Sequence, residues 1–162
     1  MKGSRLKVLV VDDDRDTANS MADLLVLWGY EAEPMYSGNS ALAAIRLRRP
    51  AAVLLDIGMA PMSGFEFATL LRDLPGRDRT TVVAISGYTG EAYRARSRTL
   101  GIAHYLVKPV DLNLLQAILR GMVEECNPPQ LRGELATRSH VSPRTAKSRR
   151  VARRAIATGT GG

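Results

Sequence analysis

The sequence has little that could crosslink the chain or carry it across a membrane. Its only cysteine among 162 residues is Cys126, which excludes an internal disulfide and a multi-cysteine metal cage and indicates a reducing compartment. The early apolar run 8–11 is too short for the core of a signal peptide, and no later run approaches the roughly 20 apolar residues of a membrane-spanning helix. We therefore expect a cytoplasmic protein with no membrane partner.

The sequence also lacks any acidic excess, and its basic excess is confined to one end. The net charge is +7, yet residues 1–125 hold 15 basic and 15 acidic side chains, whereas residues 126–162 hold eight basic side chains against one acid. Two prolines at 128–129 end the last helical pattern, and the apolar residues beyond them are too few for an independent core. We expect one domain over residues 1–126 and a basic, disordered tail over 127–162.

The first 126 residues alternate between short apolar strand patterns and longer helical ones. Three of the strand patterns are nearly continuous apolar runs, which is typical of parallel strands that are covered on both faces. The order predicts an α/β fold, a doubly wound five-stranded parallel sheet with helices on both faces. The predicted strands are 6–11, 31–36, 51–56, 81–86 and 103–108. The first predicted helix carries an apolar stripe of Met21, Leu24, Leu25 and Trp28 and ends at Gly29. The other predicted helices are 40–48, 64–73, 90–100 and 111–125.

The last predicted helix has a recognisable start and an apolar side. Asp111 is a suitable N-cap residue because its short acidic side chain can accept hydrogen bonds from the first turn. The residues predicted for its buried side are Leu112, Leu115, Ile118, Leu119 and Met122.

Polar side chains follow four of the predicted strands. They are Asp12 to Asp14, Asp56, Ser86 and the pair Lys108-Pro109, and the carboxyl ends of the strands are where such sheets bind ligands. Clustered carboxylates repel one another unless a cation is present, and hard oxygen ligands suit Mg²⁺ together with a phosphate group. A lysine and a hydroxyl would then bind phosphoryl oxygens, and an aspartate acceptor would give an acyl phosphate. Each residue alone has an ordinary structural explanation, but their joint placement favours such a site.

Four sequence blocks resemble the receiver domain of two-component response regulators, and most closely the receivers of hybrid histidine kinases. The blocks are VLVVDDD (8–14), LLDIGMAPMSG (54–64), AISGY (84–88) and HYLVKPVD (104–111), and the resemblance covers about residues 5 to 125. It implies a flavodoxin-like strand order 2-1-3-4-5. It also implies a phosphoacceptor that takes part in its own phosphorylation and dephosphorylation, and not an enzyme. The expected partners are a histidine kinase or histidine phosphotransfer protein and a downstream protein.

The resemblance assigns roles to the residues around the expected Mg²⁺ ion. Asp56 matches the phosphoacceptor, which is also a metal ligand. Asp12 and Asp13 match the acidic pair that holds Mg²⁺, and the backbone carbonyl of Gly58 matches the third protein ligand position. Asp14 is expected to have no ligand role.

The resemblance also assigns a switch. Ser86 matches the hydroxyl that moves toward the phosphoryl group, and Tyr105 matches the aromatic ring that turns inward with it. Lys108 matches the invariant lysine of the family, and the Lys108-Pro109 peptide bond is expected to be cis. The switched surface would include Tyr93, Arg94, Arg98, Tyr105 and the start of the last helix, through which a phosphorylation-dependent homodimer could form. The arginines at 94, 96 and 98 fit an ordinary solvated face equally well.

Two departures from the family pattern concern the surroundings of Asp56. Ala60-Pro61 stands where the family commonly has proline one residue earlier, so the loop path could differ. At the two positions that tune dephosphorylation in the family, small Gly58 leaves room for water, whereas bulky Tyr88 could shield an acyl phosphate. The sequence therefore leaves the lifetime of the phosphorylated state open.

Other functions fit the sequence less well. A phosphatase of the haloacid dehalogenase type would need glycine after Asp14 instead of Arg15, and a dinucleotide site would need glycines after the first strand. We expect a single-domain response regulator that acts as a phosphorelay intermediate, a phosphate sink or a regulator of a partner protein. The alternative is a receiver whose tail binds nucleic acid or an acidic partner through a short basic helix at 143–157, although the tail composition favours disorder.

Overall fold

A computed structural model describes residues 5–126 of the chain. The predictions made for residues 127–162, a disordered basic tail or a basic helix at 143–157, lie outside the described residues. Within the described residues, no helix has the length and hydropathy needed to cross a membrane.

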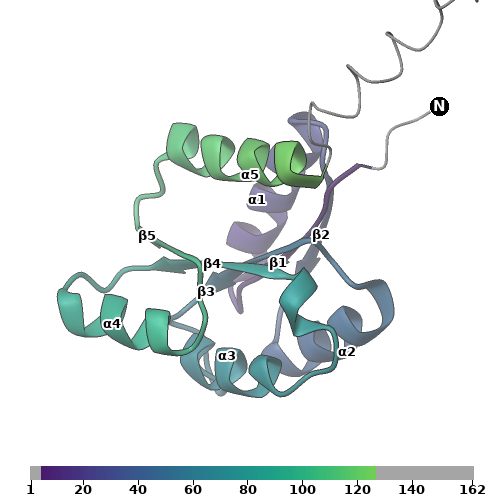
Figure 1. The fold of residues 1–162 in the computed structure, drawn as a ribbon. Coiled ribbons are helices and arrows are strands. Elements are labelled where there is room, and N and C mark those ends of the chain that lie inside the picture. Colours follow the sequence, from purple (N-terminus) through teal and green to yellow (C-terminus); the bar gives the residue numbers. More distant parts are fainter. Residues whose placement is uncertain (1–4, 127–162) are drawn as a thin grey trace, which may run out of the picture. The chain divides into compact units, whose positions relative to one another are not determined.

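The central element is a parallel sheet of five strands. In chain order they are β1 (Lys7–Val11), β2 (Glu31–Met35), β3 (Ala52–Asp56), β4 (Thr81–Ser86) and β5 (His104–Val107). The strand order across the sheet is β2-β1-β3-β4-β5, which confirms the predicted flavodoxin-like topology (Figure 1). All five residues of the central strand β3 are buried, as its continuous apolar run predicts.

Helices cover both faces of this sheet, as predicted for a doubly wound fold (Figure 1). One face carries α1 (Arg15–Leu27) and α5 (Leu112–Cys126). The other face carries α2 (Gly38–Arg48), α3 (Gly64–Arg72) and α4 (Glu91–Thr99), and a short 3₁₀ turn, η1 (Arg77–Arg79), precedes β4.

Two apolar cores fill the space between the sheet and these two layers. The larger core joins α2 and α3 to the sheet through side chains such as Phe67 and Leu71, both completely buried. The second core joins α1 and α5 to the opposite face. Three members of the predicted stripe, Met21, Leu25 and Trp28, pack there, whereas the fourth, Leu24, is not part of this core. Alternate residues of β1 and β3 face the two cores, which is why these strands are apolar throughout.

Side-chain caps start several helices close to the carboxyl ends of the strands. The carboxylate of Asp14 accepts a hydrogen bond from Thr17 N–H at 2.8 Å and so caps α1. Ser63 and Glu66 form a reciprocal capping box at α3. The predicted cap of α5 is also present, since the Asp111 carboxylate accepts from Asn113 N–H at 2.9 Å. Each cap fixes the direction in which the chain leaves the sheet edge.

One prediction for α5 is wrong. Leu112 was expected on the buried side of the helix, but 44% of its surface is exposed. Leu112 belongs to the first turn, and there it lines a cavity with Pro109 and Val110 instead of packing in the core. The core begins three residues later, at the completely buried Leu115.

Candidate functional site

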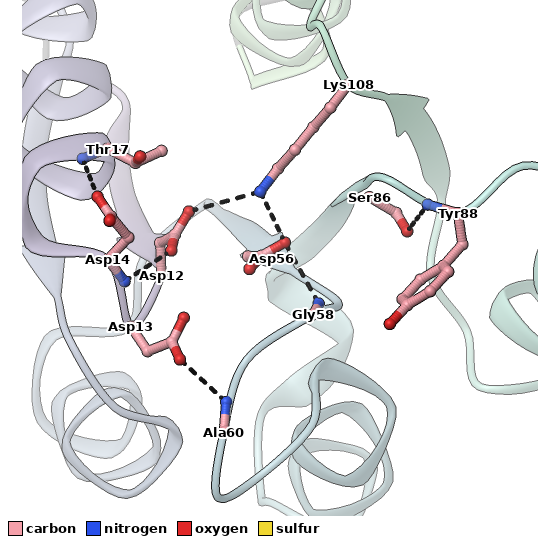
Figure 2. Close-up of polar contacts among 10 residues, drawn as sticks. All are labelled: Asp12, Asp13, Asp14, Thr17, Asp56, Gly58, Ala60, Ser86, Tyr88 and Lys108. Carbon is pink, nitrogen blue, oxygen red and sulfur yellow. Dashed lines mark hydrogen bonds and ion pairs between the residues drawn. The ribbon is translucent and has the colours of Figure 1, made fainter.

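Three carboxylates converge at the carboxyl ends of β1 and β3. Asp12 and Asp13 follow β1 directly, and Asp56 is the last residue of β3 (Figure 2). One oxygen atom from each of the three lies within 4.8 Å of the others. Asp12 and Asp56 are only 5% and 7% exposed, whereas Asp13 faces solvent. Adjacent parallel strands therefore bring together acids that are more than 40 residues apart in the sequence.

Lys108 approaches this cluster from the end of β5, as Figure 2 shows. Its Nζ lies 3.1 Å from Oδ1 of Asp56 and 4.0 Å from Oδ2 of Asp12. The lysine side chain is 39% exposed, so its ammonium group bridges the buried acids and solvent. The peptide bond between Lys108 and Pro109 is cis, and so is the bond between Ala60 and Pro61.

Backbone N–H groups hold each of the three carboxylates in place. Asp14 N–H donates to Asp12 Oδ1 at 2.9 Å, and Ala60 N–H donates to Asp13 Oδ2 at 3.0 Å. Gly58 N–H reaches Asp56 Oδ1 at 3.3 Å. Figure 2 draws all three bonds. Each donor is a loop N–H group that takes no part in the hydrogen bonds of a helix or of the sheet.

The electrostatics of the site favour a bound cation. Burial raises the pKa of Asp12 above its ordinary value, and the neighbouring charges of Asp56 and Asp13 raise it further. The hydrogen bond from Asp14 N–H and the charge of Lys108 lower this pKa, but they do not cancel the rise. Three acids face one lysine, so the cluster keeps an excess of negative charge when all are ionised. Carboxylate oxygens with room for water are the ligands that Mg²⁺ prefers, and the residues present fit this ion.

Asp14 serves the fold and not the cluster. Its carboxylate caps α1, and the hydrogen bond from Thr17 N–H lowers its pKa below the ordinary value. That Asp14 has no ligand role stays a prediction.

Gly64 was not selected by the sequence reasoning, yet it borders the site. A Cβ atom at this position would lie 2.5 Å from the carbonyl oxygen of Asp56 and 2.7 Å from Cα of Ile57. The first turn of α3 therefore packs directly against the backbone that carries Asp56. The only signal in the sequence was a glycine directly after the helix cap Ser63, which propensity alone does not explain.

The predicted switch residues meet at Tyr88. Ser86, the last residue of β4, is completely buried, and its Oγ accepts a hydrogen bond from Tyr88 N–H at 3.0 Å (Figure 2). The Tyr105 hydroxyl donates to the carbonyl of the same residue at 2.9 Å. The structure thus brings Asp12, Asp13, Asp56 and Lys108 together and connects Ser86 with Tyr105 through the Tyr88 backbone. Gly58 contributes its N–H, and a metal-binding role for its carbonyl stays a prediction.

A cavity of about 370 Å³ adjoins the cluster between α1 and the start of α5. Asp12, Asp56 and Lys108 lie at its polar end, and apolar side chains such as Met21 and Val110 line the remainder.

Comparisons with known proteins agree with this geometry. The family model described as "Response regulator receiver domain" matches residues 8–120. Response regulator MprA of Mycolicibacterium vanbaalenii is 32% identical over 131 residues, which are 81% of this chain and 56% of that protein. An uncharacterised 14.6 kDa protein of Leptolyngbya boryana is 30% identical over 116 residues, or 71% of this chain and 88% of that protein. The chain thus spans about half the length of MprA but most of the smaller relative.

The solved structures include chemotaxis protein CheY4 of Vibrio cholerae. It matches with a TM-score of 0.69 and 28% sequence identity, and the match covers 74% of this chain and 99% of CheY4. Receiver domains typically bind Mg²⁺ at an acidic pocket, and the cluster of Asp12, Asp13 and Asp56 occupies the corresponding end of this sheet. The chain belongs to the response regulator receiver domain family of two-component signalling.

Proposed function

We propose that Asp56 accepts a phosphoryl group from a histidine kinase or a histidine phosphotransfer protein. The observation that carries this proposal is the ion pair between Asp56 and Lys108, with Oδ1 and Nζ 3.1 Å apart, inside a cluster of three carboxylates. Asp12, Asp13 and Asp56, with the backbone carbonyl of Gly58, would hold Mg²⁺ there. When bound, the ion offsets the negative charge that a phosphate brings to these acids.

The transfer needs few groups from the protein. A carboxylate oxygen of Asp56 attacks the phosphorus atom, the bond from phosphorus to the donor's imidazole nitrogen breaks, and the imidazole leaves with the bonding electrons. Lys108 is placed to bind a phosphoryl oxygen because its Nζ already contacts the attacking carboxylate. Burial of Asp12 and Asp56 keeps these charges in an environment where they interact strongly.

The acyl phosphate would then act on the output surface. We propose that the Ser86 hydroxyl turns toward the phosphoryl group and that the Tyr105 ring turns inward, which changes the surface formed by α4, β5 and the start of α5. Three arginines of this surface already have partners: Arg94 lies 5.3 Å from the centre of the Tyr105 ring, Arg96 lies 4.4 Å from that of Phe65, and Arg98 pairs with Glu91. Such contacts can be exchanged when the surface meets a downstream protein or a second copy of the chain.

The site assignment is tested by labelling with a small phosphodonor. Acetyl phosphate and Mg²⁺ should phosphorylate the wild-type chain, and Asp56→Asn should abolish the labelling because asparagine cannot form the acyl phosphate. Asp14→Asn is the matched control, since Asp14 caps α1 beside the cluster, and its labelling should persist. Labelling of Asp56→Asn at the wild-type level would refute the assignment.

The extent of the receiver domain along the chain belongs to the same proposal. We take residues 1–126 as a receiver that serves as a relay intermediate, a phosphate sink or a regulator of a partner. The family match at residues 8–120 and the even charge balance of residues 1–125 support this. A chain cut after residue 126 should be labelled at the wild-type rate.

The basic excess of residues 126–162 supports a second candidate, a receiver whose tail binds nucleic acid or an acidic partner. Contacts between basic side chains and phosphates make affinity fall steeply with salt. If the full chain and residues 1–126 bind a polynucleotide equally weakly at every salt concentration, this candidate is excluded.

A further inference from the structure

Asp13 is the exposed member of the carboxylate cluster, and the loop between β3 and α3 holds its side chain. Asp12 and Asp56 are buried, whereas Asp13 faces solvent. Ala60 N–H donates to Asp13 Oδ2 at 3.0 Å, and within residues 5–126 this carboxylate has no other hydrogen bond (Figure 2). In this arrangement an oxygen of Asp13 already lies within 4.8 Å of oxygens of the other two acids. The bond therefore holds Asp13 where it can share a cation with its neighbours.

The same loop also rests on the start of helix α2. Gly38, the first residue of α2, is buried, and a Cβ atom there would collide with Sδ of Met62 and lie 3.3 Å from its Cγ. The next nearest group is the Phe67 ring at 3.4 Å, an ordinary van der Waals distance. Met62 is half-buried and packs against the core of the α2 and α3 layer. Its thioether therefore fills the space that a side chain at residue 38 would occupy.

A small cavity lies between these two contacts. Its volume is about 100 Å³, and its lining comes from Asp13, from residues 37–39 at the start of α2 and from residues 59–62 of the loop. Ala60 stands between two methionines that pack against the core, Met59 and Met62. Because the loop borders free space here, the direction of the Ala60 N–H depends on how firmly these two side chains are seated.

We propose that Met62 and Gly38 are positioning residues for the Mg²⁺ site. Met62, seated over Gly38, fixes the path of the loop. The loop presents the Ala60 N–H, which keeps the exposed Asp13 carboxylate among the other ligands. Hydrogen bonds that orient the ligands of a metal commonly account for ten- to a hundredfold in its affinity. The proposal rests on the proposed function, because it concerns the ion that Asp13 would bind, and it names what sets the affinity for that ion.

A merely structural role for Met62 predicts a different result. If Met62 only fills the core, its truncation lowers the free energy of unfolding and leaves the affinity for Mg²⁺ unchanged. If Met62 positions the loop, its truncation also frees Asp13, and the folded protein binds Mg²⁺ more weakly. The affinity of the folded protein therefore separates the two roles.

The experiment is a double-mutant cycle on the Mg²⁺ dissociation constant of the full chain, measured by titration calorimetry. Met62→Ala removes the side chain that seats the loop, and Gly38→Ala displaces it because the added Cβ collides with Sδ. We expect each variant to raise the dissociation constant about three- to tenfold, at or below the lower end of the range for groups that orient metal ligands. The double variant should bind no more weakly than the weaker single variant, since alanine at residue 62 leaves room for the new Cβ.

The Ala60 amide gives a second readout that needs no metal. Its hydrogen exchange, followed by nuclear magnetic resonance, should accelerate in Met62→Ala, in Gly38→Ala and in Asp13→Ala, because each change loosens or removes its bond to Asp13.

Leu70→Ala is the matched control, since Leu70 is 46% exposed and lines an open groove with Met62 without touching the loop bond. It should change neither the Mg²⁺ affinity nor the exchange of the Ala60 amide. Met62→Leu, which keeps the side-chain volume, should bind Mg²⁺ within about twofold of the wild type. Met62→Val replaces Met62→Ala if the alanine variant does not unfold cooperatively.

Each of three results would overturn the proposal. They are wild-type Mg²⁺ affinity in both single variants, a double variant whose loss of affinity is the product of the single losses, and unchanged exchange of the Ala60 amide in Met62→Ala. If the wild-type chain binds no Mg²⁺, the proposed metal site fails and this inference fails with it. If the wild type binds Mg²⁺ and Asp13→Ala weakens it, but Met62 and Gly38 have no effect, this inference alone is refuted.

Discussion

Single residues at the carboxyl ends of the strands carry charges that lower the stability of the fold. Asp12 is buried beside two other acids, and its pKa is raised because burial disfavours the ionised form. Backbone donors and Lys108 hold the cluster together without removing its excess negative charge. This is the pattern expected where a cation and a phosphate are to be bound, since perturbed carboxylates gather at functional sites.

Asp12→Asn should stabilise the metal-free protein. A group whose pKa is higher in the folded than in the unfolded state disfavours folding at pH values above both, and this effect disappears as the pH falls toward the ordinary value of 3.8. We expect the free energy of unfolding at pH 7 to rise by about 1 kcal/mol, within the usual range of single substitutions. Denaturant unfolding at pH 7 and pH 3 measures the difference, which should shrink in acid. A less stable variant at pH 7 would contradict the prediction.

Gly64→Ala should destabilise the protein although alanine favours helices. The added Cβ would collide with the backbone of Asp56 and Ile57, which cannot move without distorting β3. We expect a loss of about 2 to 4 kcal/mol, as for other strained core substitutions, and slower labelling of Asp56. Gly121→Ala in α5 is the matched control, since nothing lies within 4 Å of its Cβ, and it should gain about 0.5 to 1 kcal/mol. Equal stabilities in urea unfolding would show that the close approach at Gly64 is not tight.

At the scale of elements, short loops connect the end of each strand to the start of the next helix, and these loops orient the polar groups of the site. The capping box of Ser63 and Glu66 begins α3 seven residues after Asp56 ends β3, and the loop between them also supplies the N–H groups of Gly58 and Ala60. Helix α4 is the exception, because it has no side-chain cap and only one buried residue. Helix α4, which belongs to the proposed output surface, is thus the most weakly attached of the five helices described.

The capping box predicts a pH dependence of the opposite sign to that of Asp12. The hydrogen bond from Ser63 N–H lowers the pKa of Glu66 below its ordinary value of 4.5. Glu66 therefore favours the folded state above pH 4.5, and this contribution is lost as the pH falls through the lowered pKa. Glu66→Gln should be less stable than the wild type at pH 7 and nearly equal to it at pH 2.5. A stability difference that grows in acid would contradict the role of the cap.

At the scale of the whole molecule, binding at the site should stabilise the fold. A ligand that binds only the folded state adds about 2.7 kcal/mol at a concentration one hundred times its dissociation constant. We expect Mg²⁺ to raise the thermal midpoint of the wild-type chain and to have little effect on Asp12→Asn. Ca²⁺ and Na⁺ at matched ionic strength serve as controls for selectivity and screening. An equal Mg²⁺ response in both proteins would remove Asp12 from the ligand set.

Much of this organisation could be predicted from the sequence. Strands buried on both faces are apolar throughout, so β1, β3 and β4 are evident as runs, and their polar ends mark where the chain leaves the sheet. The order of strands and helices then restricts the topology, because parallel strands need right-handed crossovers. The acids and the lysine of the site follow from the same pattern, since strand ends in such a sheet share one edge.

Other features depend on contacts between segments that are distant along the chain. The sequence by itself determined the fold class and which residues gather at Asp56, because periodicity and strand ends are local properties. Only the tertiary structure decided that Leu112 lines a cavity, that α3 touches the backbone of Asp56 at Gly64, and that the Tyr88 ring stacks on Tyr93. The physical reason is that a side chain's packing partner depends on how neighbouring elements are oriented, and one local pattern is compatible with several such orientations.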